Sequence, residues 1–228
     1  VNDSTDYQVY NNSAQQDAST EAVRETASEV LKYKGNIVTT YYYSTSCGKT
    51  TTMKAWGTSE NESNGYLQSI EVKDKNGDYE KSLPWYRWEA DIDQDILSTL
   101  LAENVKKNIG TVQSLEVTKT GPGGVALQIK AVGDKGSITV DTENKIRKAL
   151  GGNGYEIKKQ DGTVAQSGTL LPSAFFKVKK AGNIFKIIGG GYGHGIGMSQ
   201  NGANEMAKKG KNYQEILQMF YPGTTIEK

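Results

Sequence analysis

A glycine-rich run near the end of the chain constrains the fold more than any other feature of the sequence. Residues 189–202 read Gly-Gly-Gly-Tyr-Gly-His-Gly-Ile-Gly-Met-Ser-Gln-Asn-Gly, and seven of these fourteen residues are glycine. Such a run loses much backbone entropy on folding and packs no side chains, so it suits a backbone that needs positive φ or approaches another group closely. Because turns need only one or two glycines, we expect a functional site around His194, the only histidine. The alternative is that His194 is a structural residue, hydrogen-bonded in a tight turn.

Two familiar glycine-rich motifs do not fit this run. A dinucleotide-binding turn needs G-x-G-x-x-G, but the glycine pairs at 191/193 and 193/195 are followed by Ile196 and Met198 where the third glycine should stand. The esterase motif G-x-S-x-G fails because Asn201 replaces its last glycine. The run is therefore neither a Rossmann turn nor an esterase nucleophile elbow.

A second polar segment, residues 41–50, reads Tyr-Tyr-Tyr-Ser-Thr-Ser-Cys-Gly-Lys-Thr and contains the Gly-Lys-Thr of a phosphate-binding loop. That loop also needs a glycine where this chain has Tyr43, whose Cβ would obstruct the approach to phosphate, so we expect no nucleotide. The hydroxyls of Ser44, Thr45, Ser46 and Thr50 suit a hydroxyl-rich ligand. The alternative is a polar turn that satisfies its own backbone.

Composition excludes several classes of function. The 27 Lys and Arg residues against 26 Asp and Glu leave no excess charge for phosphates, so we expect no nucleic-acid partner. One cysteine and one histidine cannot supply the four ligands of a structural zinc site, so we expect neither metal nor cofactor. No apolar run reaches the roughly 20 residues of a membrane span, and no signal sequence opens the chain at Val1. We expect any export or anchoring element to lie outside residues 1–228.

The pattern of apolar residues predicts an α+β fold of mixed, largely antiparallel sheets with short packed helices, in which residues 85–150 form a possible inserted sub-lobe. Predicted strands are 8–10, 36–43, 66–72, 85–92, 114–118, 125–132, 137–140, 155–163 and 175–188. One predicted helix starts at Glu21 and has Val30 and Leu31 on its buried face. A second follows an N-cap at Asp93, and three more span residues 143–150, 200–209 and 213–220.

Several separated segments together carry a family resemblance. In order they are Gln8-Val9-Tyr10, residues 41–50 with Trp56-Gly57, Ile146-Arg147-x-x-Leu150-Gly151, Leu171-Pro172-Ser173, the glycine run, and Tyr221-Pro222-Gly223-Thr224. This order resembles the stage II sporulation protein D family, which includes the amidase enhancers. The resemblance spans nearly all of residues 1–228.

The resemblance implies an enzyme of peptidoglycan remodelling during sporulation and engulfment, a lytic transglycosylase that cleaves glycan strands stripped of stem peptides. In that chemistry one glutamic acid protonates the glycosidic oxygen between N-acetylmuramic acid and N-acetylglucosamine. As a carboxylate it then takes the proton of the muramyl 6-hydroxyl while the 1,6-anhydro ring closes, so its pKa must be raised. The family's glutamate lies in an alanine-rich helix ahead of the Gln-x-Tyr strand, and no segment of this chain matches that helix.

We therefore expect the catalytic residue to lie outside this chain, and residues 1–228 to bind the glycan strand without cleaving it. The nearest matches to the missing helix are Glu21-Ala22-Val23 and Glu205-Met206-Ala207, which we interpret as ordinary helix positions. If the chain does cleave glycan, the first carboxylates to mutate are Glu25, Glu29 and Glu205. Some family members carry a zinc site of cysteines and a histidine before the Gln-x-Tyr strand, and this chain has neither residue type there.

We predict one continuous glycan-binding cleft formed by the two motif segments. An alternative is a non-catalytic glycan-binding module that activates a partner N-acetylmuramoyl-L-alanine amidase, and another is a hydrolase with a Cys47–His194 pair. The resemblance implies as partners denuded glycan strands, the stage II sporulation amidase (protein P) and membrane protein M. It implies a location at the extracytoplasmic face of a spore-forming bacterium's membrane. The residues predicted to bind substrate are Tyr41, Tyr43, Ser44, Thr45, Ser46, Gly48, Thr50, Tyr192, His194, Gly195, Met198, Ser199 and Gln200.

Overall fold

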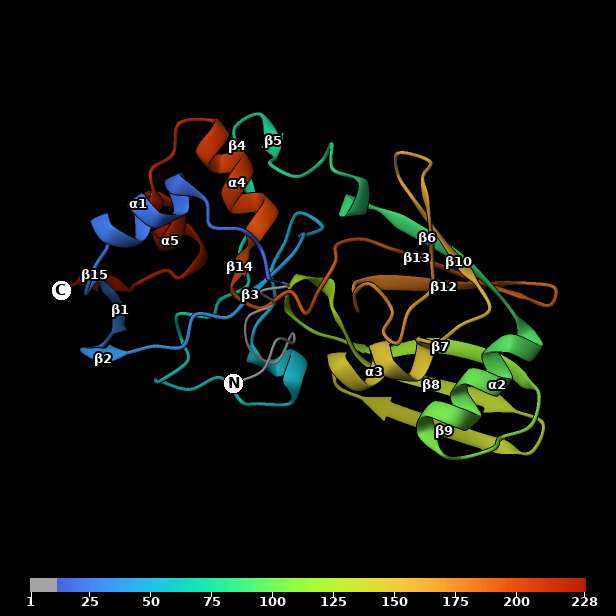
Figure 1. The fold of residues 1–228 in the computed structure, drawn as a ribbon. Helices are drawn as coiled ribbons and strands as arrows, with labels where there is room; N and C mark the ends of the chain where they lie inside the picture. The colour runs from blue at the N-terminus through green and yellow to red at the C-terminus, as the bar shows by residue number, and fades with distance from the viewer. Residues whose placement is uncertain (1–11) are drawn as a thin grey trace.

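The computed structural model describes residues 12–228 and has the predicted α+β class, with short helices and largely antiparallel sheets (Figure 1). The strand predicted at residues 8–10 lies outside the described residues. No helix in the described range is long and apolar enough to cross a membrane.

The largest sheet of the described residues is five-stranded and antiparallel, with strand order β11-β10-β6-β13-β12. In β6 the side chains of Trp88, Ala90 and Ile92 are buried, as the alternation in the sequence predicts. The strand begins later than predicted because Pro84–Tyr86 forms a 3-10 turn (η2), for which the fixed φ of proline is suited. The strands are β6 (Trp88–Asp93), β10 (Glu156–Lys159), β11 (Val164–Gln166), β12 (Phe176–Ala181) and β13 (Ile184–Gly189).

A second sheet of three antiparallel strands, in the order β7-β8-β9, packs with α2 and α3 on one side of the molecule (Figure 1). Its strands are β7 (Val112–Thr120), β8 (Ala126–Gly133) and β9 (Gly136–Asp141), the three that the sequence predicts, with η3 (Pro122–Gly124) between β7 and β8. Asp93 caps α2 (Gln94–Val105) as predicted, since its side chain accepts a hydrogen bond from the Asp95 N–H at 2.8 Å. The helix predicted over 143–150 is α3 (Glu143–Leu150). The sub-lobe 85–150 stays a prediction, and β6 within it pairs with β13 outside it.

The other side of the molecule holds the remaining helices and short sheets (Figure 1). The helices predicted over 200–209 and 213–220 are α4 (Gln200–Lys208) and α5 (Tyr213–Phe220). Asn212 and Glu215 form a capping box at the start of α5. The other elements are α1 (Asp17–Glu25), β1 (Val30–Tyr33), β2 (Asn36–Ile37), β3 (Tyr42–Tyr43), η1 (Met53–Trp56), β4 (Lys73–Asp74), β5 (Gly77–Asp78), β14 (Met198–Ser199) and β15 (Thr225–Glu227).

The helix predicted from Glu21 was wrong in its length and packing. It ends at Glu25, and Val30 and Leu31 belong to β1, which pairs with β15 at the other end of the chain. Ser28 has φ of 69°, which breaks the helix, and the remote strand supplies the backbone partners that the sequence pattern could not show. The helix buries none of its residues, and Val23 is 71% exposed.

The strands predicted over 36–43 and 66–72 were also wrong in extent. Only Asn36–Ile37 and Tyr42–Tyr43 are strands within the first, and the second has one isolated bridge, between Lys49 and Glu71. Their β-branched and aromatic residues favour strands locally, but a strand needs a partner along its length. Tyr66 and Leu67 still enter the core, from an irregular segment.

Candidate functional site

The two polar motifs predicted to form the site lie side by side and share backbone hydrogen bonds. The β14 strand pairs in parallel with β3, so that Met198 lies opposite Tyr42. Farther along, Thr45 and Tyr192 exchange two backbone hydrogen bonds of 3.0 and 2.8 Å. The Thr51 N–H donates to the Gly195 carbonyl at 2.7 Å. The meeting of these segments, more than 140 residues apart in sequence, is therefore built from main-chain contacts.

The glycines of the run allow this close approach. A Cβ on Gly197, where φ is 75°, would lie 2.1 Å from the Tyr41 carbonyl oxygen. A Cβ on Gly193, where φ is 117°, would lie 2.6 Å from the Cβ of Tyr43. Both positions need positive φ and a missing side chain. The group that the run approaches closely is the protein's own 41–43 segment.

His194 is held in one tautomer by the backbone of both loops. The Ile196 N–H donates to its Nδ1 at 3.1 Å, so Nε2 carries the proton and donates to the Tyr42 carbonyl at 2.9 Å. Burial lowers the pKa of His194 to about 4, which keeps the imidazole neutral near pH 7. The hydrogen bonds match the structural alternative for this residue. Because both ring nitrogens of His194 are already hydrogen-bonded, a ligand can contact only the face of the ring.

Two clusters of aromatic rings flank Gly193. In the Trp56 cluster, which comprises Tyr41, Trp56 and His194, the Trp56 ring lies 5.0 Å from each of the other two rings. In the Trp85 cluster, the Tyr192 ring lies 4.8 Å from the Trp85 ring, and Tyr192 is 42% exposed. Such rings present flat, apolar faces with polar groups at their edges, which suits sugar rings. The site therefore offers aromatic contacts with a cation beside them, since Lys159 Nζ lies 5.0 Å from the centroid of the Trp85 ring.

Four hydroxyl residues predicted to line the cleft, Thr45, Ser46, Thr50 and Ser199, lie inside the protein instead, with no more than 1% of their surface exposed. Ser46 and Ser199 are buried because both bind Glu80, a fully buried carboxyl that the sequence did not reveal. Glu80 accepts hydrogen bonds from the Ser46 N–H at 2.9 Å, from the Ser46 hydroxyl, and from the Ser199 hydroxyl at 2.7 Å. The expectation that these four hydroxyls line an open groove is therefore corrected.

Burial raises the pKa of Glu80. The carboxyl joins the 41–50 segment to the start of α4, where Ser199 is the N-cap. No local pattern marks this residue in the sequence, because Glu80 stands in an irregular segment and its partners are remote. Its role as a bridge between the loops follows only from the tertiary structure.

The other predicted binding residues divide by exposure. Tyr41, Ser44 and Met198 are half-buried and Gln200 is exposed, so these can reach a ligand at the surface. Tyr43 is buried against His194, with ring centroids 5.5 Å apart. Gly48 and Gly195 are also buried.

A buried ion pair beneath Trp56 was also missed. Glu143 accepts from the Trp56 Nε1–H at 3.2 Å and from Arg147 Nη1 at 2.8 Å, and it has no exposed surface. The Nε of Arg147 donates to the Leu171 carbonyl at 2.7 Å. The spacing of the two charges, four residues apart in α3, is the signal that could have found the pair. This network joins three motifs that are separated in the sequence, those that contain Trp56, Arg147 and Leu171.

The geometry disfavours a Cys47–His194 catalytic pair. Both nitrogens of His194 are engaged by backbone groups. Burial raises the pKa of the Cys47 thiol, which opposes the thiolate needed for attack. The Cys47 side chain instead lies against Gly190.

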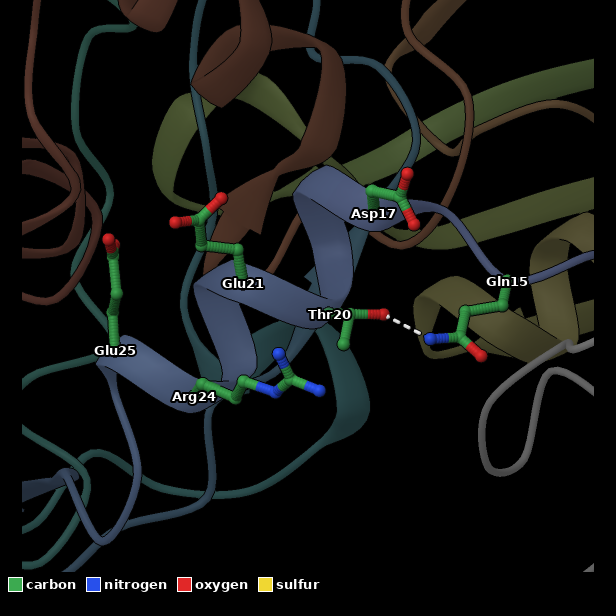
Figure 2. A pocket seen from close by; sticks show the side chains of 6 residues that line it. All are labelled: Gln15, Asp17, Thr20, Glu21, Arg24 and Glu25. Atoms are coloured by element: carbon green, nitrogen blue, oxygen red, sulfur yellow. Dashed lines mark hydrogen bonds between the residues drawn. The ribbon is translucent and has the colours of Figure 1, made fainter.

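Two of the three carboxylates named as first candidates for catalysis pair with other side chains. Glu205 pairs with Lys208 at 2.6 Å, and Glu29 accepts from the Tyr213 hydroxyl at 2.9 Å. Glu25 belongs to the exposed helix α1, where a pocket of about 530 Å³ is lined by Glu25 and five neighbours (Figure 2). Figure 2 shows that these side chains come from α1 and from Gln15, two residues before it, so within residues 12–228 no second element converges on the pocket. No group of three or more His, Cys, Asp or Glu side chains within residues 12–228 is placed to hold a metal ion.

Comparison with known proteins first defines a class of domain. Residues 53–197 match the family described as a domain of unknown function, DUF8618, and the chain belongs to that family. The matched region contains the Trp56 cluster except for Tyr41, both buried carboxyls, and the glycine run up to Gly197.

The relatives then identify the chain as a member of the stage II sporulation protein D and amidase enhancer family. It is 28% identical to the amidase enhancer of Bacillus subtilis (strain 168), over 99% of this chain and 35% of that protein. It is 30% identical to stage II sporulation protein D of the same organism, over 91% of this chain and 50% of that protein. It is also 30% identical to an uncharacterized protein of Brachyspira hyodysenteriae, over 99% of this chain and 53% of that protein. The chain thus spans about a third to a half of the length of these relatives.

Proposed function

We propose that this chain binds glycan strands of peptidoglycan at the junction of residues 41–50 and 189–202, in the service of cell-wall remodelling. The observation that carries the proposal is the pair of aromatic clusters flanking Gly193, at the point where the family's motifs meet. Aromatic rings with polar groups at their edges favour contact with the faces of sugar rings.

Within this proposal the described residues hold the strand rather than protonate it. General acid catalysis needs a carboxyl within hydrogen-bond reach of the glycosidic oxygen. Glu80 and Glu143, the buried carboxyls at this site, have no exposed surface and are bonded to protein groups. We therefore expect residues 1–228 to release no soluble 1,6-anhydro-muropeptides from denuded glycan strands when products are analysed by mass spectrometry. Release of such products would mean that a carboxyl of this chain reaches the strand, with Glu205 the first to mutate.

A second candidate function is favoured by the relative named amidase enhancer. In this version the bound strand is presented to a partner N-acetylmuramoyl-L-alanine amidase, which does the cutting. Stage II sporulation protein P is the amidase we would test, with membrane protein M as a further partner. Both partners fit a location of this chain at the extracytoplasmic face of the membrane. Faster amidase turnover on insoluble wall when the chain is added would support this version.

Binding is tested by removing the most exposed ring. Tyr192→Ala leaves the backbone pairing with Thr45 in place and should weaken binding to stem-peptide-free glycan strands about tenfold, a loss of about 1.4 kcal/mol. The matched control is Tyr213→Ala, since Tyr213 lies on α5 and is 41% exposed against 42% for Tyr192. Isothermal titration calorimetry of both variants decides the matter. Equal affinity of the two variants would contradict the proposed site.

A further inference from the structure

A separate pocket adjoins the Trp56 cluster. It has a volume of about 650 Å³ and lies between residues 33–41 and residues 53–67. Its size falls within the roughly 300–1,000 Å³ typical of small-molecule sites. Tyr41 and Met53 line the pocket, and the Tyr41 ring also lies against Trp56. A ligand that covers Trp56 could therefore continue past Tyr41 into this pocket.

The pocket is nearly neutral. Among the described residues of its lining, the charged ones are Lys34 and Glu62, and these pair with each other at 3.5 Å. Glu62 is 93% exposed, so its carboxylate points to solvent rather than into a protected interior. An anionic or cationic ligand would find no unbalanced charge in this lining. An uncharged ligand fits it better.

The remaining lining combines aromatic rings with amide and hydroxyl groups. The Tyr33 ring lies 5.4 Å from the Tyr66 ring, and Ile37 adds an apolar side chain that is 70% exposed. An N-acetylated sugar has the matching chemistry, since it presents C–H faces, an acetamido methyl, and several hydrogen-bonding groups. The amide and hydroxyl residues of the lining are Asn36, Thr39, Thr58, Asn61, Ser63 and Asn64.

Resting on the proposed function, we infer that this pocket, between residues 33–41 and 53–67, is a second saccharide-binding subsite for N-acetylglucosamine units, the uncharged sugars of the same strand, reached past Tyr41. It binds sugar without reacting with it, because Glu62, the carboxylate among its described lining residues, is 93% exposed and pairs with Lys34, whereas a general acid needs a raised pKa. Affinity should therefore grow with strand length until a strand covers both the Trp56 cluster and the pocket.

The test introduces a tryptophan side chain that fills the pocket from one of its two walls. Thr39→Trp acts from one wall and Thr58→Trp from the other; both residues are exposed, and their backbone hydrogen bonds to Tyr66 and Met53 do not depend on the side chains. Thr139→Trp, at an exposed position of β9 outside the pocket, is the matched control. The probe is a stem-peptide-free glycan strand of defined length, an octasaccharide, titrated by calorimetry.

We expect each pocket variant to bind the octasaccharide about tenfold more weakly, and the Thr139 control to bind as the unchanged protein does. Normal binding by every folded pocket variant, together with weaker binding by Tyr192→Ala, would overturn this inference and leave the proposed function standing. No binding by the unchanged protein would overturn both. If one pocket variant fails to fold, the variant at the opposite wall still decides.

Discussion

Lowering the pH tests the environment of His194, because the pKa of this side chain is about 4 in the folded protein and about 6.5 in an unfolded chain. Between these values the unfolded chain binds a proton that the folded protein does not. The free energy of unfolding should therefore fall as the pH drops from about 6.5 to about 4, and His194 should cost nothing above that window.

The magnitude follows from the separation of the two pKa values. A separation of about 2.5 units corresponds to about 3.4 kcal/mol in all, of which about 2 kcal/mol is lost by pH 5. His194→Gln removes the titration and keeps a donor for the Tyr42 carbonyl, but it loses the acceptor for the Ile196 N–H. That lost bond should cost about 1 kcal/mol at neutral pH.

The stability curves of the two proteins should cross. The unchanged protein should be more stable than His194→Gln by about 1 kcal/mol at pH 7.5 and less stable by about 1 kcal/mol at pH 5. Urea unfolding followed by the fluorescence of the three tryptophans measures both values. Groups such as Glu80, whose raised pKa has the opposite effect on stability, titrate in both proteins and cancel in the difference.

A direct measurement of the pKa is also simple, because His194 is the only histidine. Its ring resonances in an NMR titration should not move between about pH 8 and about pH 5.5. A titration midpoint near pH 6.5, or a stability difference between the two proteins that stays constant with pH, would refute the reasoning.

Three further predictions concern stability. Glu80→Ala should lower the free energy of unfolding by about 3 kcal/mol or more, since two buried serine side chains and one N–H lose their acceptor; Glu80→Gln, which keeps an oxygen, should cost less. Arg147→Met should cost about 3–5 kcal/mol in thermal or urea unfolding, whereas adding Glu143→Leu should recover part of the loss, because one buried charge without its partner is worse than none. Gly197→Ala should unfold or fail to express, because its Cβ meets a carbonyl at 2.1 Å, while Gly210→Ala, with φ of 85° and open space, should cost only about 1–2 kcal/mol. Similar losses for the two glycine variants would mean that backbone strain, not close approach, explains the glycine run.

Elements with strong local signals could be predicted from the sequence. The cap at Asp93 and the apolar face behind it predict α2, and the glycines at 121–124 predict the turn between β7 and β8. The helix expected through Val30 and Leu31 was wrong because β15, a strand nearly 200 residues away, pairs with that segment. The residue pattern of a strand does not show which distant strand will pair with it.

The candidate site divides in the same way. The glycine run and the 41–50 segment were predicted to meet, and they do. The prediction that hydroxyl groups line an open groove failed for Thr45, Ser46, Thr50 and Ser199, because composition cannot say whether a hydroxyl faces solvent or protein. Glu80 and the Glu143–Arg147 pair carry ordinary charged side chains whose burial depends on partners far along the chain.

The sequence by itself determined the class of the fold, the family, and the segments that meet at the site, since glycine content, capping residues and short motifs act through the backbone close by. Only the tertiary structure decided which side chains face a ligand. Burial and hydrogen bonding depend on every group that surrounds an atom, and at this site those groups come from five separate parts of the chain: the segments around Tyr43, Trp56, Glu80, Arg147 and His194.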